Sequence, residues 1–92
     1  MKLVYSPESQ KQIRVLPPQT KAGIRQALER LAEDPYCGKP LQRDLDGYWS
    51  IRYQRWRIIY RIRENEKRIE VVTLGLRRSI YQDVSSLVVP KN

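Results

Sequence analysis

Hydrophobic residues between positions 19 and 33 recur every three or four residues and form one stripe. This spacing is typical of a helix with one buried face, so we predict a helix from about Gln19 to Glu33. The dipeptide Asp34-Pro35 ends the helix, because the residue before a proline avoids the helical conformation. The stripe consists of Ile24, Ala27, Leu28, Leu31 and Ala32.

A shorter helix is predicted upstream from its start and stop signals. Ser6 is a favoured N-cap, Pro7 suits the first helical position, and Glu8 complements the positive end of the helix dipole. The helix should extend to about Leu16, where two prolines follow. The alternating residues before Ser6 predict a short strand, at positions 1 to 5.

After position 47 the hydrophobic pattern changes to a period of two, which is typical of strands with one buried face. In the first strand Trp49, Ile51 and Tyr53 share one side, and Ser50 and Arg52 share the other. The next run, from position 56 to 63, also alternates. One side carries Trp56, Ile58, Tyr60 and Ile62, and the opposite side carries Arg57, Ile59, Arg61 and Arg63.

A third strand of this meander is predicted from Arg68 to Gly75. Its adjacent Val71 and Val72 indicate burial on both faces and therefore a central position in the sheet. The order strand, helix, helix and three strands predicts an α+β fold, a small antiparallel sheet with both N-terminal helices on one face. The length of 92 residues fits a single domain, spanning 1–92.

Composition narrows the classes of function. The formal net charge of +8 favours a polyanionic partner such as RNA, DNA, an anionic membrane or an acidic protein. With one cysteine, Cys37, and no histidine, neither an internal disulfide nor a zinc site is expected. We find no membrane span and no signal peptide, and therefore expect a cytoplasmic protein without a metal or cofactor.

The predicted sheet face opposite the helices carries several arginines. Arg52 and Arg57 flank one turn, so they should be neighbours on paired strands, where their like charges repel. No carboxylate shares this face of these two strands before Glu64. Such arginines can simply keep an exposed face soluble, but the uncompensated charge favours a phosphate-binding role for Arg52, Arg57 and Arg61.

The stretch GLRRSIYQDV, from Gly75 to Val84, follows the last strand and carries Arg77, Arg78 and Tyr81. Arginine suits a phosphodiester and the negative charge that develops as it is cleaved. RNA cleavage by the adjacent 2′-hydroxyl also needs proton transfer, and nearby arginines would favour the tyrosine anion. Tyr81 is therefore a candidate acid or base, although it would also suit packing of the last segment onto the sheet.

The residues from Leu45 to Arg63 (LDGYWSIRYQRWRIIYRIR) and from Gly75 to Tyr81 (GLRRSIY) resemble the RelE/ParE toxin superfamily. In its RelE-like branch, the resemblance implies an mRNA interferase that cleaves translated mRNA in the ribosomal A site. It also implies a cognate RelB-like antitoxin, through which the pair binds operator DNA. The ParE-like branch implies a different toxin, a non-enzymatic inhibitor of DNA gyrase. An inactive homologue that titrates an antitoxin is a third alternative.

Carried over by position, the resemblance implies catalytic roles for Arg57, Arg77 and Tyr81. It implies contacts with RNA phosphates for Arg52, Arg61 and Arg78, and stacking on a base as an alternative role for Tyr81. Three positions depart from the family pattern. Ser50 and Leu76 stand where many relatives carry a basic residue and a histidine, and Gln54-Arg55 replaces the usual Gly-Asp turn. That turn favours positive φ, which Gln and Arg adopt reluctantly.

Overall fold

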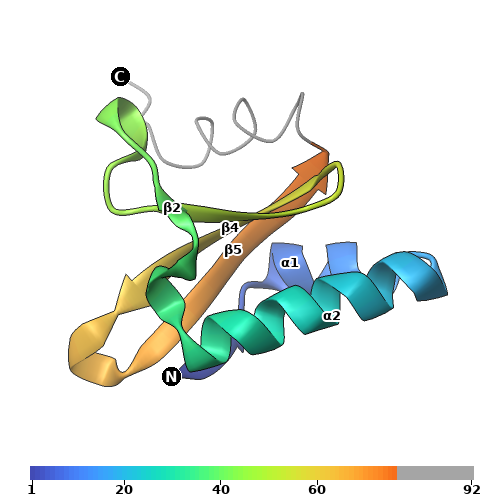
Figure 1. Ribbon diagram of the computed structural model, residues 1–92, viewed down its shortest axis with the longest axis horizontal. Coiled ribbons are helices and arrows are strands. Elements are labelled where there is room, and N and C mark those ends of the chain that lie inside the picture. Colours follow the sequence, from blue (N-terminus) through green and yellow to red (C-terminus); the bar gives the residue numbers. More distant parts are fainter. Residues whose placement is uncertain (77–92) are drawn as a thin grey trace.

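The computed structural model describes residues 1–76. Two α-helices lie together against one face of a five-stranded sheet (Figure 1). In chain order the elements are β1 (Lys2–Tyr5), α1 (Pro7–Arg14), α2 (Pro18–Glu33), β2 (Lys39–Pro40), β3 (Trp49–Tyr53), β4 (Trp56–Arg63) and β5 (Arg68–Leu76). Three short 3-10 turns connect them: η1 (Pro35–Cys37), η2 (Arg43–Leu45) and η3 (Glu64–Glu66).

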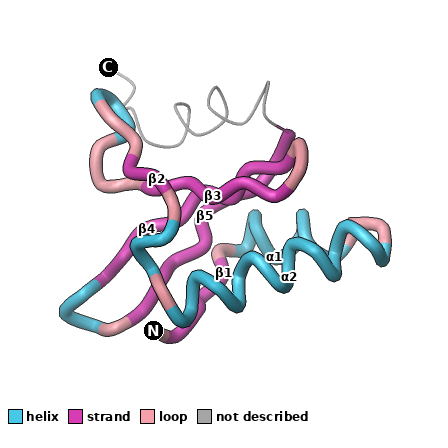
Figure 2. The backbone as a smooth tube through the Cα atoms, in the orientation of Figure 1, coloured by secondary structure: helices cyan, strands magenta, loops and turns pink. Residues whose placement is uncertain are grey.

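The strand order is β1-β5-β4-β3-β2, so the last strand is central, as its two adjacent valines predict. The predicted α+β fold with both helices on one face is confirmed, but the sheet is mixed rather than wholly antiparallel. β1 pairs with β5 in parallel, and the long connection that such a pair requires includes α1 and α2 (Figure 2). The segment predicted as a plain loop after α2 also contains the two-residue edge strand β2.

The signals at the helix ends act as predicted. The Ser6 hydroxyl accepts a hydrogen bond from the Ser9 amide at 3.0 Å and donates one to the Val72 carbonyl at 2.6 Å, which attaches the start of α1 to the sheet. The first helix ends at Arg14, two residues before the predicted end, and Leu16 leaves the helix to enter the core. Pro18 opens α2 at its first position.

The main core lies between the helices and the sheet. The α2 stripe is buried except for Ala32, which is half-buried. Side chains from alternate positions of β3, β4 and β5 complete it, as the period of two predicts. The buried members are Leu16, Ile24, Ala27, Leu28, Leu31, Ile51, Ile58, Tyr60, Ile69, Val71 and Leu74. None of the described helices is long and apolar enough to cross a membrane.

The sheet contains one irregularity, a bulge in β5. Tyr60 pairs with Val71 and Ile59 pairs with Thr73, so Val72 is an extra residue on β5. Strict alternation from Val71 would turn Leu74 away from the helices, whereas the extra residue returns it to the core. Gln12 of α1 accepts a hydrogen bond from the Leu74 amide at 2.9 Å and also bonds the Thr73 hydroxyl, which secures the bulge.

The opposite face of the sheet is partly covered by the chain between β2 and β3. Ile59 is fully buried on this face, and Leu41, Leu45, Tyr48 and Val72 pack around it. The face is therefore closed in its middle by a small second cluster. The cluster does not extend to the end of the face near the β3–β4 turn, where Arg52 is exposed. In that turn Gln54 has a positive φ of 53°, in agreement with the strain predicted for it.

Candidate functional site

The two arginines that flank the β3–β4 turn form a cross-strand pair. Arg52 lies directly opposite Arg57, and Arg57 is in turn opposite Gly75 on β5. The flanking residues Ile51 and Ile58 point into the helix-side core, so alternation places both arginines on the other face. The predicted pairing is confirmed, and it puts two like charges side by side.

This arginine pair lines a cavity of about 230 Å³. The residues around it come from η1, β2, β3 and β4, which the sheet brings together from distant parts of the chain. They are Cys37, Gly38, Lys39, Ser50, Ile51, Arg52 and Arg57. We refer to this cavity as the basic cavity, because three of its lining residues among positions 1–76 are cationic and none of those is acidic.

The cations of the basic cavity lack acidic partners in the described part of the chain. The ion pairs recorded there involve neither Lys39 nor Arg52 nor Arg57. The Nε atom of Arg57 is buried and has no hydrogen-bond partner among residues 1–76. Arg68 Nε is in the same state, but its guanidinium is already held by two carboxylates. An anion is therefore the group that the basic cavity would accommodate.

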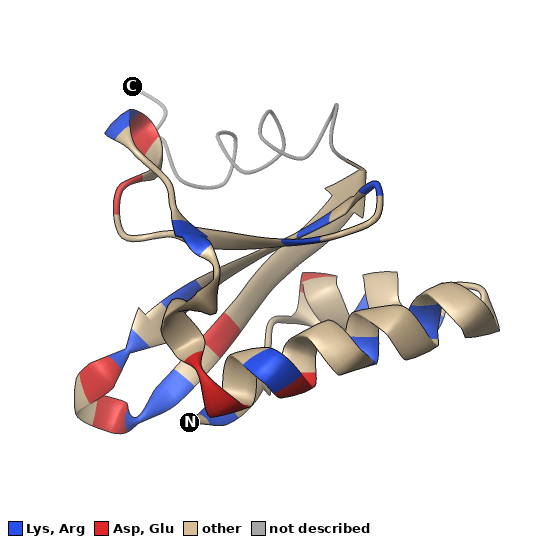
Figure 3. Cartoon of the chain, viewed as in Figure 1, with Lys and Arg blue, Asp and Glu red and all other residues tan. Residues whose placement is uncertain are grey.

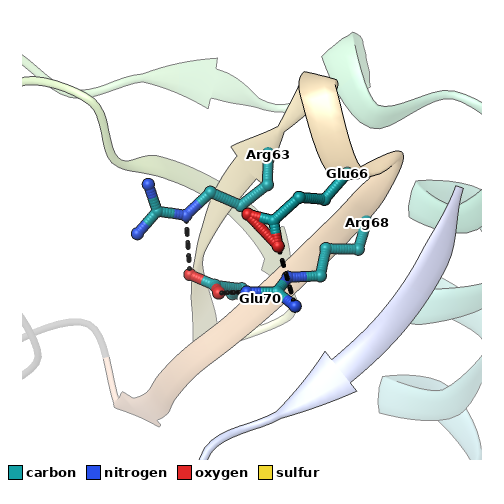
Figure 4. Close-up of polar contacts among 4 residues, drawn as sticks. All are labelled: Arg63, Glu66, Arg68 and Glu70. Atoms are coloured by element: carbon teal, nitrogen blue, oxygen red, sulfur yellow. Dashed lines mark hydrogen bonds and ion pairs between the residues drawn. The ribbon is translucent and has the colours of Figure 1, made fainter.

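Acidic residues lie at the other end of the sheet, in η3 and on β5 (Figure 3). There Glu70 binds Arg63 at 3.1 Å and Arg68 at 2.9 Å, and Arg68 also binds Glu66 at 2.9 Å (Figure 4). Burial of the Glu70 carboxyl opposes its ionisation, but the hydrogen bonds from the two arginines hold its pKa below the ordinary value. Within residues 1–76, the face thus has one end where carboxylates pair with arginines and one end where the arginines have no acidic partner.

Arg61 belongs neither to these ion pairs nor to the lining of the basic cavity. Its guanidinium lies over the ring of Tyr48, 5.0 Å from the centroid, in a cation–π contact. It lines a separate cavity of about 550 Å³ together with Val4, Glu70 and Val72. Arg61 follows Arg57 by four residues, a distance of about 13 Å along a strand. The structure therefore does not bring Arg61 into the basic cavity with Arg52 and Arg57.

A buried tyrosine holds the wall of the basic cavity in place. Tyr60 is fully buried and donates a hydrogen bond of 2.9 Å to the Pro35 carbonyl, while its ring stacks near Trp49. Burial raises the pKa of the Tyr60 phenol far above its ordinary value, with Cys37 and Asp34 contributing in the same direction. Tyr60 is thus a structural residue and keeps its proton.

Three residues predicted for the site, Arg77, Arg78 and Tyr81, lie outside the described residues. Leu76, which replaces the usual histidine, is exposed at the end of β5. The residue that sequence analysis missed is Lys39. It lies in a stretch without periodicity, and the proline after it argues only against a central strand, so its pairing with Ser50 is what reveals its position.

The described part of the site can bind and stabilise negative charge. Its lining offers two guanidiniums, one ammonium, the hydroxyl of Ser50 and the thiol of Cys37. No three or more His, Cys, Asp or Glu residues in positions 1–76 are grouped as a metal site would require. Among these groups the ammonium and the thiol are of kinds that can exchange a proton, whereas the guanidiniums keep their charge.

Comparison with known proteins agrees with this architecture. Residues 3–81 match the family model described as ParE toxin of type II toxin–antitoxin system, parDE. The toxin RelG of Mycobacterium tuberculosis is 29% identical over 80 residues, which span 85% of this chain and 92% of RelG. The toxin RelE of the same organism is 36% identical over 53 residues, 56% of this chain and 55% of that protein.

Solved structures show the same fold. A RelBE toxin–antitoxin complex from M. tuberculosis contains a chain with a TM-score of 0.75 and 27% identity, covering 83% of this chain and 96% of that one. A YoeB/ParE toxin from Agrobacterium tumefaciens has a TM-score of 0.73 and 26% identity, with 84% and 99% covered. The isolated RelE toxin of E. coli shares the fold at 16% identity, with a TM-score of 0.72 and coverage of 96% and 98%.

The fold is therefore that of the RelE/ParE superfamily of small α+β toxins, as the sequence resemblance implies. The chain belongs to the ParE toxin family and is a toxin of a type II toxin–antitoxin system.

Proposed function

We propose that this toxin is a ribosome-dependent endoribonuclease that cleaves translated mRNA in the ribosomal A site. The observation that carries the proposal is the cross-strand pair Arg52–Arg57, which lines the basic cavity without an acidic partner among residues 1–76. Two guanidiniums side by side repel each other unless an anion lies between them. A phosphodiester supplies that anion, and its geometry suits bidentate contact with arginine.

In the proposed reaction the 2′-hydroxyl of the RNA attacks the adjacent phosphorus. The bond from phosphorus to the 5′-oxygen of the next nucleotide breaks, which leaves a 2′,3′-cyclic phosphate and a free 5′-hydroxyl. The proton lost by the 2′-hydroxyl is balanced by the proton gained by the leaving oxygen. Arg57 would stabilise the extra negative charge on the phosphate as the reaction proceeds, and Arg52 would hold the same group in place.

The other predicted residues complete the proposal. Arg77 and Tyr81 would act in catalysis, Tyr81 by transferring a proton or by stacking on a base. Arg78 and Arg61 would contact neighbouring phosphates, with Arg61 first leaving its contact with Tyr48. The arginines supply the charge stabilisation that a metal ion supplies in other nucleases, so the proposed activity is independent of metals and cofactors.

The ribosome has a specific task in this proposal. A cavity of about 230 Å³ is too small to enclose several nucleotides, so we expect the protein alone to align an RNA strand poorly for in-line attack. The ribosome would present the mRNA in the required geometry, and naked RNA should be cut slowly. We accordingly propose that the toxin acts in the cytoplasm.

We also propose that a RelB-like antitoxin silences this toxin. Related chains form RelBE complexes in M. tuberculosis, in E. coli and in Pyrococcus horikoshii. The net charge of +8 on this chain suits an acidic or amphipathic partner segment that covers the basic face. Binding of the pair to operator DNA would then occur through the antitoxin.

A non-enzymatic inhibitor of DNA gyrase is the second candidate function. The observation that favours it is the family match itself, since the family is described as ParE toxin. The same basic cavity would then contact a protein–DNA complex rather than RNA. Arg52 and Arg57 would contribute to affinity but not to a chemical step.

Induced expression in a bacterium separates these functions. Primer extension is run on a translated mRNA and on an untranslatable copy, for wild type, Arg57→Ala, Tyr81→Phe and Arg30→Ala. Arg30 is exposed on α2, away from the site, so Arg30→Ala is the matched control for loss of one charge. We expect cuts only in the translated message, reduced about 100-fold or more in Arg57→Ala and unchanged in Arg30→Ala. Growth arrest with both messages intact and a DNA-damage response would refute the nuclease and support the gyrase inhibitor.

A further inference from the structure

Lys39 is the third cation of the basic cavity, and the roles implied by the family resemblance do not include it. It lies on β2, an edge strand of the sheet, and is itself exposed. Its cross-strand partner is Ser50, which is buried and neutral and lies two residues before Arg52 on β3. Directly paired residues project to the same face of a sheet, so Lys39 and the arginine pair share one side.

The spacing within the cavity distinguishes Lys39 from the arginines. Arg52 and Arg57 are direct partners, so their Cβ atoms are about 5 Å apart and their guanidiniums can converge on one phosphate. Lys39 is the diagonal neighbour of Arg52, with Cβ atoms about 7–8 Å apart. Its ammonium is a point charge on a flexible stem, which suits a second anionic group beside the first.

The backbone around Lys39 is fixed on both sides, so its position is not that of a loose loop. Before it, the Tyr60 hydroxyl holds the Pro35 carbonyl. After it, the Leu41 amide donates to the Tyr48 carbonyl at 2.8 Å. Gly38 lies so close to β3 and β4 that a methyl group there would overlap the Tyr60 hydroxyl and lie 2.5 Å from the Ser50 carbonyl oxygen. The absence of a side chain at Gly38 is therefore what lets β2 carry Lys39 to the cavity.

We propose that Lys39 is a substrate-binding residue that contacts the phosphate adjoining the one held by Arg52 and Arg57 on the same RNA strand. The inference rests on the proposed nuclease function and adds a second phosphate subsite to it. Lys39 contributes to binding and alignment of the strand, whereas Arg57 contributes to the chemical step. Ser50 carries no charge, so the cation on the Ser50 side of the Arg52–Arg57 pair comes from β2 and is Lys39.

Binding of a short, fluorescently labelled 2′-O-methyl RNA to the full-length protein tests the subsite directly, since this RNA lacks the attacking hydroxyl. Dissociation constants are measured over a range of salt concentrations for wild type, Lys39→Ala, Lys39→Arg, Arg57→Ala and Lys11→Ala. Lys11 is exposed on α1 and serves as the matched control. Lys39→Ala should weaken binding about three- to tenfold and lower the slope of log K against log salt by about 0.7, as expected for one lost phosphate contact. Lys39→Arg should keep both values near wild type.

Cleavage on programmed ribosomes supplies a second measurement. Lys39→Ala should raise the half-saturating ribosome concentration and leave the maximal rate nearly unchanged, while Arg57→Ala should lower the maximal rate. Thermal unfolding of each variant confirms that the fold is kept. If Lys39→Ala matches Lys11→Ala while Arg57→Ala loses binding and activity, the subsite is refuted and the nuclease stands. If Arg57→Ala also matches the control, the proposed function itself fails, and the subsite fails with it.

Discussion

Removing the hydroxyl of Tyr60 tests how the wall of the basic cavity is held. In Tyr60→Phe the ring and its packing against Trp49 remain, and only the hydrogen bond of 2.9 Å to the Pro35 carbonyl is lost. Tyr60 is fully buried, so water cannot readily replace the lost donor. The Tyr60 hydroxyl is the side-chain donor recorded for that carbonyl among residues 1–76.

The expected loss of stability is about 1–3 kcal/mol, the usual result of leaving a buried acceptor unsatisfied. For a domain of this size, 1 kcal/mol corresponds to a decrease in Tm of about 4–8 °C. Thermal unfolding followed by circular dichroism measures the change, and urea unfolding at 25 °C gives the free energy independently.

Tyr36→Phe is the matched control, because it removes the same atom from a side chain that is 47% exposed. We expect this control to stay within about 0.5 kcal/mol of wild type. A Tyr60→Phe variant as stable as Tyr36→Phe would refute the argument that Tyr60 anchors the segment before β2. It would also remove one of the two contacts that fix Lys39.

Three further changes test the rest of the fold. Ser6→Ala removes the N-cap of α1 and should lower the free energy of unfolding by about 1–2 kcal/mol; a urea midpoint equal to wild type would contradict this. Gln12→Leu leaves the amide and hydroxyl of the β5 bulge without their partner, so amide hydrogen exchange around Thr73 should accelerate, and unchanged protection would contradict it. The pKa of Glu70 is lower in the folded protein than its ordinary value of 4.5. Its ion pairs therefore stabilise the fold fully above pH 4.5, and this contribution is lost as the pH falls through the pKa of the folded state. Wild type should therefore be more stable than Glu70→Gln at pH 6, and the difference should shrink as the pH is lowered below 4.5; a difference independent of pH would refute the assignment.

Local patterns predicted most of the elements because each rests on contacts between near neighbours. The period of two from Trp49 to Arg63 identified the buried face of both strands, and the observed register confirms it. The pairing of Arg52 with Arg57 followed from a short turn between two strands, which leaves little freedom in register.

Long-range features carried no comparable signal. The parallel pairing of β1 with β5 joins segments 66 residues apart, and four alternating residues do not reveal their partner. The bulge at Val72 reverses the side on which Leu74 lies, and a sequence pattern of period two has no means of showing one inserted residue. The cation–π contact of Arg61 with Tyr48 depends on how a loop folds over the sheet.

The sequence by itself determined the class of fold, the two helices, the face on which the arginines lie and the excess of positive charge. These properties depend on the spacing of residues a few positions apart and on composition. Tertiary structure alone decided which charges are neutralised and which are left over. Glu70 binds Arg63 and Arg68 at one end of the sheet, while Lys39 and Arg52 line the same cavity at the other. Both outcomes arise because the sheet places residues that are distant in the chain within reach of one another, and electrostatic energy depends on distance in space.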